Sequence, residues 1–286
     1  MMEEFECALG KLDSAGRRKF GEDWVPRLER RRVKLEGAYA TLYEQDRDPI
    51  PYASLSAQTA YVFASAPARA EYTRQYLLRH RKALAGPIFS SSNVKVVSFG
   101  GGPASELVGL IRYIEEGDAD EPVESSDFTV YDKDGDWAEV AFGIVNGLET
   151  AIDITIRYEE VDAASRKRME RIDLSDIDLV IFSYVMSELA KLGRKDQIAE
   201  NFRVILDSMK IGGKILFIDN RHPLFIRYFQ SCKLVKGLIQ RNDDDSPVDC
   251  DFSNAEGVFQ RLSKTLDWTP RTELRSVSKL IVRTTK

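Results

Sequence analysis

The sequence predicts an α/β protein with a doubly wound, mostly parallel sheet and an N-terminal helical cap. Three observations lead to this fold class. From residue 94 onward, short runs rich in β-branched and aromatic residues alternate with helix-like stretches, which is the pattern of parallel strands joined by crossover helices. The run DLVIFSY at 178–184 is almost continuously apolar, as expected of a strand buried on both faces. Glycines follow the first of these strands directly, and a helix-like stretch follows the glycines.

The bulk composition is that of a globular protein. The chain has 286 residues, of which 43% are hydrophobic and 30% charged, so it is long enough to bury a core without cross-links. The net charge of −5 gives no support for a broad nucleic-acid surface. The three cysteines are odd in number and far apart, which argues against a disulfide framework or a structural zinc site. We therefore expect a reducing compartment and no metal.

The N-terminus is acidic and has no apolar stretch of signal-peptide length, and no uninterrupted apolar run approaches the length of a membrane span. We expect a cytoplasmic protein, with a nuclear location also compatible, and no membrane partner. The sequence sets no oligomeric state.

Two domains are expected, a helical cap or lid at 1–85 and a main domain at 86–286. In the cap, Pro26 and Pro67 predict helix boundaries, because proline is tolerated only near the start of a helix. A polar, proline-containing break is expected at 46–52. The cap is the natural lid of the main domain, so tyrosines from it could face a ligand, namely Tyr52, Tyr61 or Tyr72.

The main domain is predicted to alternate strands with helices. The expected strands are 94–99, 127–132, 155–162, 178–184, 214–219 and 276–284. The expected helices between them are 105–117, 137–148 and 185–210. An irregular insertion is expected around 235–271, where the acidic and turn-prone stretch 242–251 predicts a surface segment.

The turn after the first strand has the sequence VVSFGGGPASE at 96–106. Glycines let the backbone turn sharply and leave no Cβ in a ligand's way, and the free N–H groups of the next helix can meet an anion. The segment resembles the first motif of class I methyltransferases that use S-adenosylmethionine, in which an acidic residue precedes three alternating glycines. Here those positions hold Ser98, Gly100, Gly102 and Ala104. Ser98 lacks the charge that would attract the cofactor's amino group, and Glu106 is close enough to replace it.

The resemblance implies a Rossmann-like methyltransferase fold, S-adenosylmethionine as cofactor, and methyl transfer as the reaction. It implies that Asp132 binds the ribose hydroxyls, that Asp162 receives the adenine amino group, and that Ser183 and Tyr184 lie near the sulfonium. Trp137 is expected either to wall the ribose or adenine or to pack in the core. The full set of expected cofactor contacts is Ser98, Gly100, Gly101, Gly102, Pro103, Ala104, Glu106, Asp132, Lys133, Trp137, Asp162, Ala163, Ser183, Tyr184 and Val185.

No catalytic residue stands out, because the sulfonium is already activated and the protein mainly positions the reactants. Tyr184, Asp219 and His222 are the candidates, since strand ends in this fold face the active site. The methyl acceptor is open among RNA, protein and small molecules. The mildly basic N-terminal third keeps RNA in view, although the net charge does not favour it.

Two other functions remain open. The departures at Ser98 and Ala104 are compatible with an inactive methyltransferase-fold protein that acts as a binding or scaffold subunit. A nicotinamide-dependent dehydrogenase fits less well, because Ser105 stands where a dinucleotide-binding fingerprint has its third glycine.

Overall fold

The computed structural model describes residues 1–40, 50–80, 89, 91–116, 122–189, 195–220, 238–244, 247–252 and 256–283. No helix within these ranges is both long and apolar enough to cross a membrane.

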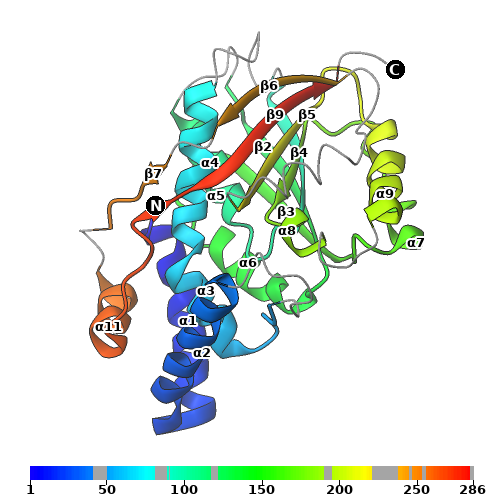
Figure 1. Ribbon diagram of the computed structural model, residues 1–286. Helices are drawn as coiled ribbons and strands as arrows, with labels where there is room; N and C mark the ends of the chain where they lie inside the picture. The colour runs from blue at the N-terminus through cyan, green and yellow to red at the C-terminus, as the bar shows by residue number, and fades with distance from the viewer. Residues whose placement is uncertain are drawn as a thin grey trace.

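Within the described residues, the centre of the molecule is a seven-stranded sheet with the order β3-β2-β1-β4-β5-β9-β6 (Figure 1). The first five strands are parallel to one another. β9 is antiparallel to both β5 and β6, between which it lies. The strands are β1 (Asn93–Phe99), β2 (Ser125–Asp132), β3 (Asp153–Glu160), β4 (Leu179–Ser183), β5 (Lys214–Asn220), β6 (Leu238–Asp244) and β9 (Ser276–Arg283). The order confirms the predicted doubly wound, mostly parallel sheet.

The central strands are buried on both faces of the sheet, and successive side chains of each strand point in opposite directions. In β4, Leu179 and Ile181 enter one hydrophobic core, whereas Val180 and Phe182 enter the other. Figure 1 shows α4 and α5 on one side of the sheet and α9 on the other. The helices after β1 are α5 (Ser105–Glu115), α6 (Ala138–Val145), α7 (Arg166–Met169), α8 (Met186–Leu189), α9 (Lys195–Ser208) and α11 (Gly257–Leu266).

Before β1, the chain forms α1 (Glu3–Phe20), α2 (Trp24–Ala40), α3 (Leu55–Ala64) and α4 (Ala66–His80). Pro26 and Pro67 lie in the first turns of α2 and α4, so both predicted boundaries are confirmed. Phe5 and Trp24, both fully buried, share a core with Trp137 of the main domain. The cap therefore packs against the main domain.

Two sequence expectations need correction. The stretch 235–271 was expected to be irregular, but it contains β6, α11 and β7 (Val248–Asp249), which pairs with β8 (Glu273–Leu274). Val248 is fully buried, so 242–251 is not simply a surface segment. Polar turn residues concealed β6 and β7, whose sheet partners β9 and β8 come later in the chain. The helix expected at 185–210 is described as α8 and α9, with residues 190–194 outside the described ranges.

Candidate functional site

The turn after β1 is built on left-handed backbone. Gly100 has φ +70° and Gly102 has φ +48°, values that glycine adopts without steric cost. The N–H of Gly100 donates to the carbonyl of Tyr131 at 2.8 Å, which ties the turn to β2. A Cβ at Gly100 would lie 2.8 Å from the Cβ of Val185, so only glycine fits there. Ala104, at φ +63°, takes the left-handed conformation in the glycine's place.

Asp132, the last residue of β2, holds this turn. One of its carboxylate oxygens accepts the N–H of Gly102 at 2.9 Å, and the other accepts the N–H of Asp134 at 3.0 Å. Burial raises the pKa of Asp132, and the two N–H groups partly oppose the shift. An ionised carboxylate has about four acceptor positions, so two remain for a ligand.

A cavity of about 940 Å³ opens at the carboxyl ends of the five parallel strands. Each of these strands contributes its last residue or the one after it, and the N-terminal helices with the stretch before α3 supply the rest of the wall. This is the edge where doubly wound folds bind ligands. The strand-end residues are Gly100, Asp132, Glu160, Ser183 and Asn220, and the N-terminal elements contribute Tyr39, Ile50, Tyr52, Ala53, Tyr61 and Arg69.

The structure brings most of the predicted cofactor contacts to this cavity. Those that line it are Gly100, Gly102, Pro103, Asp132, Lys133, Trp137, Asp162, Ala163, Ser183, Tyr184 and Val185. Four others lie behind the surface and are buried, namely Ser98, Gly101, Ala104 and Glu106. They support the turn without lining the cavity.

Ser98 and Glu106 show how this support works. The Ser98 hydroxyl lies against Gly101 and has no hydrogen-bond partner among the described residues. Glu106 accepts a hydrogen bond from the hydroxyl of Ser183, which does line the cavity. Its second carboxylate oxygen is buried and also lacks a partner within the described ranges. Burial raises the pKa of Glu106.

The catalytic candidates are not arranged as bases. Asp219 is fully buried, does not line the cavity, and accepts the backbone N–H groups of Ser187 at 2.9 Å and Asn220 at 2.7 Å. It holds the start of α8 in place. Tyr184 does line the cavity, but burial raises its pKa to about 12 and its hydroxyl bonds Ser276. His222 lies outside the described residues.

Aromatic side chains form much of the cavity wall. The rings of Tyr52 and Tyr61 lie 5.9 Å and 5.3 Å from Trp137 between centroids. The hydroxyls of Tyr39 and Tyr52 are 3.0 Å apart. Tyr72, the third expected ligand-facing tyrosine, is instead buried and donates to the carbonyl of Ser276.

The sequence analysis missed several residues of the cavity lining, and Arg69 is the one among them that carries a positive charge. It lies three positions before Tyr72 and seven before Tyr76, both fully buried. Helical periodicity puts all three residues on one face of the helix. An arginine on this otherwise apolar face is the sequence feature that could have identified Arg69 as a functional residue.

No family model matches the chain, and no curated protein matches its sequence. Several of the solved structures that resemble it are described as methyltransferases or as an rRNA methylase. TrmN from Thermus thermophilus is 14% identical, with 79% of this chain and 53% of that chain covered and a TM-score of 0.43. An rRNA methylase from Streptococcus thermophilus is 10% identical, with 72% and 95% covered and a TM-score of 0.40.

A protein of Bordetella parapertussis, described as a possible exported protein, is 13% identical, with 98% and 97% of the two chains covered and a TM-score of 0.44. Similarity at this level carries no functional argument, so the strand order must define the fold. Five parallel strands in the order β3-β2-β1-β4-β5, followed by an antiparallel β9 next to β5, give this chain a Rossmann-like fold of the methyltransferase type.

Proposed function

We propose that the chain is a methyltransferase that uses S-adenosylmethionine as methyl donor and binds it in the cavity at the strand ends. The observation that carries the proposal is the meeting of the left-handed glycine turn and the Asp132 carboxylate beside the switch point between β1 and β4. Doubly wound folds bind nucleotide-like ligands at this point. The cavity also falls within the roughly 300–1,000 Å³ range of small-molecule sites.

The residues present fit the donor. Asp132 keeps acceptor positions for a pair of ribose hydroxyls. Gly102 leaves the cavity open, since the nearest atom to its missing Cβ is 3.9 Å away, on Trp137. The aromatic faces of Trp137 and Tyr61 suit a planar base or a sulfonium.

The bound cofactor supplies an activated methyl group. The chain's residues position the two reactants and keep water out, which is where most of the rate of such a transfer originates. Asp219 is buried against backbone donors and Tyr184 holds its proton up to about pH 12. We therefore favour acceptors that are nucleophilic at neutral pH without losing a proton first.

The binding test is calorimetric titration with S-adenosylmethionine and its demethylated product, with NAD as the comparison ligand. Gly102→Arg fills the cavity and is expected to abolish nucleoside binding. Gly212→Arg is the matched control, because Gly212 also has positive φ, at +81°, but has open space around it at the start of β5. Equal affinity of the Gly102→Arg variant and the native chain would remove the proposed site, and tighter binding of NAD would favour a dehydrogenase.

A non-catalytic binding protein is the second candidate, favoured by the withdrawal of Ser98 and Glu106 from the cavity surface. Transfer of a labelled methyl group from S-adenosylmethionine into fractionated cell extract separates the two functions. The labelled fraction also identifies the acceptor as RNA, protein or small molecule. Cofactor binding without any labelled fraction would support the binding protein.

A further inference from the structure

Arg69 places a buried positive charge at the cavity. The residue is only 7% exposed, yet it belongs to the cavity lining. Its guanidinium carbon lies 3.5 Å from the ring centroid of Tyr184 and 4.9 Å from that of Tyr61. Arginine remains protonated in proteins, so this charge is permanent. The guanidinium therefore lies over both aromatic rings.

No hydrogen bond or ion pair in the described part of the chain satisfies this guanidinium, and the buried Glu106 and Asp219 carboxyl groups interact with it only at longer range. The Nε of Arg69 is buried without a hydrogen-bond partner among the described residues, and its guanidinium forms no ion pair within them. Buried charges in proteins are normally paired. An unpaired guanidinium beside a cavity therefore indicates a missing anionic partner.

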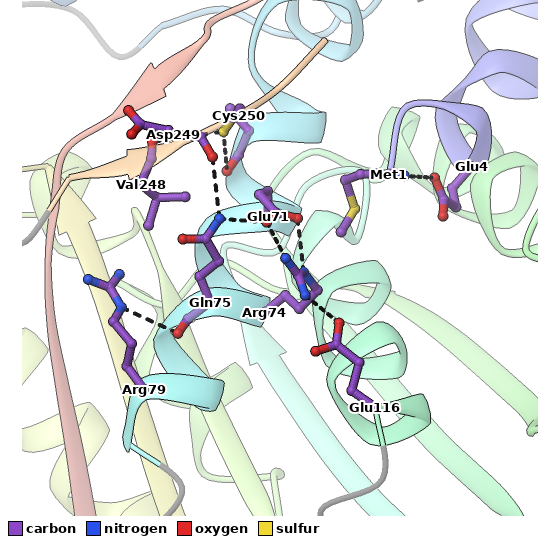
Figure 2. Close-up of polar contacts among 11 residues, drawn as sticks. Met1, Glu4, Glu71, Arg74, Gln75, Arg79, Glu116, Val248, Asp249 and Cys250 are labelled. Carbon is purple, nitrogen blue, oxygen red and sulfur yellow. Dashed lines mark hydrogen bonds and ion pairs between the residues drawn. The ribbon is translucent and has the colours of Figure 1, made fainter. Parts of the chain in front are cut away.

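Arg74 of the same helix shows what a structural arginine looks like here. Figure 2 shows its guanidinium between the carboxylates of Glu71 and Glu116, which joins α4 to the end of α5. Arg74 thus has two anionic partners and lies away from the cavity lining. The contrast within one helix argues that Arg69 is not there to hold α4 in place.

The cavity lining carries charges of both signs. At the end formed by β2 and β3, its lining carries Asp132, Asp134, Asp136 and Glu160. Arg69 stands over Tyr184 at the end of β4, where Glu106 bonds the neighbouring Ser183. Burial raises the pKa of Glu106 and the charge of Arg69 partly opposes that shift. A guanidinium over Tyr184, together with acidic side chains elsewhere in the lining, suits a ligand that carries both a carboxylate and an ammonium.

We propose that Arg69 is the carboxylate-recognition residue of the cavity and that its partner is the carboxylate at the amino-acid end of the cofactor. This inference rests on the proposed function. The planar fork of a guanidinium matches a carboxylate through two parallel N–H···O bonds. A carboxylate of the methyl acceptor offers the same chemistry, and the experiment separates these two sources.

The test compares S-adenosylmethionine with its decarboxylated analogue, which lacks only the carboxylate, by calorimetry in a buffer free of carboxylates and phosphate. The native chain is expected to prefer S-adenosylmethionine by about 10- to 100-fold, the usual value of a hydrogen bond to a charged group. Arg69→Met is expected to bind both ligands alike, at the native affinity for the analogue. Arg69→Lys keeps the charge without the fork and should fall between. Arg74→Met should retain the native preference.

A second titration adds acetate to the native chain and to Arg69→Met, each with and without the demethylated product, followed by thermal shift. One outcome is that the native chain binds both nucleosides equally well, and that acetate binds to the native chain but not to Arg69→Met. In that case the carboxylate that Arg69 recognises belongs to the methyl acceptor. If neither nucleoside binds, the proposed function fails, and acetate binding to the free chain still tests Arg69. The inference is overturned if Arg69→Met keeps the full preference, or if the native chain shows neither discrimination nor Arg69-dependent acetate binding.

Discussion

The carboxylate of Asp132 accepts the backbone N–H of Gly102 at 2.9 Å, so the end of β2 fixes the turn that follows β1. The bond connects residues that are far apart in the sequence but lie on adjacent strands. The same carboxylate thus holds the glycine turn and provides the proposed ribose contact.

Replacing Asp132 with alanine should therefore cost both stability and binding. Two buried backbone N–H groups lose a charged acceptor, which lowers the free energy of unfolding by about 3 kcal/mol. Affinity for the demethylated cofactor should fall as well. Asp127→Ala on the same strand is the control, because its ion pair with Arg157 is long, at 3.9 Å, and partly exposed, a type worth about 1 kcal/mol or less. Urea denaturation of both variants checks the difference, and equal losses would contradict it.

Adding a methyl group at Gly109 should disturb the α4–α5 contact and, through it, Arg69. A Cβ there would overlap the carbonyl oxygen of Ala70 and lie 2.9 Å from the Cβ of Thr73. Overpacking of this kind costs roughly 3 kcal/mol. Gly10→Ala in α1 has no atom within 4 Å of the new Cβ and should gain about 0.5–1 kcal/mol from helix propensity. Thermal melting of the two variants should move in opposite directions, and a stable Gly109→Ala protein would refute the close contact.

Trp137 should report on ligand binding. It lines the cavity, whereas the other two tryptophans, Trp24 and Trp268, do not. Titration with the demethylated cofactor is expected to change the intrinsic fluorescence of the native chain. Trp137→Phe should abolish that change while keeping the calorimetric affinity within about tenfold, since a ring still fills the wall. A signal that persists in the variant would place the ligand elsewhere.

Asp219 should make stability depend on pH. Burial raises its pKa to about 6, above the usual 3.8. The folded chain therefore holds this proton more tightly than the unfolded chain does. The stabilisation is fully present below about pH 4 and is lost as the pH rises through 6. Relative to Asp219→Asn, the native chain should lose on the order of 3 kcal/mol between pH 4 and pH 7. Urea denaturation of both proteins at several pH values measures this difference, and parallel pH profiles would rule it out.

Much of the fold could be predicted because hydrophobic periodicity is local. The buried runs that became β1, β4 and β5 are read directly from their apolar residues, and each prediction lies within two residues of the observed bounds. β3 begins and ends two residues earlier than expected, because its exposed, alternating side chains give weak boundary signals. β6 and β7 escaped prediction because polar side chains conceal a strand whose partner is distant in sequence.

The candidate site likewise contains some residues that the sequence could place and others that it could not. Gly100, Asp132 and Ser183 could be placed because each follows a recognisable strand. Arg69 could not, since its position depends on how α4 packs over the end of β4. The withdrawal of Ser98 and Glu106 also depends on packing, because the burial of these side chains, on β1 and at the start of α5, is determined by three-dimensional contacts.

The place of β9 has a consequence for how the protein folds during synthesis. β9 lies between β5 and β6 in the sheet but follows both in the chain. When β6 leaves the ribosome, the strand with which it pairs has not yet been made, and β5 still has an open edge. Unpaired strand edges invite association with other chains. The nascent protein thus passes through an interval in which its sheet is incomplete, and chaperone binding during translation should concentrate there.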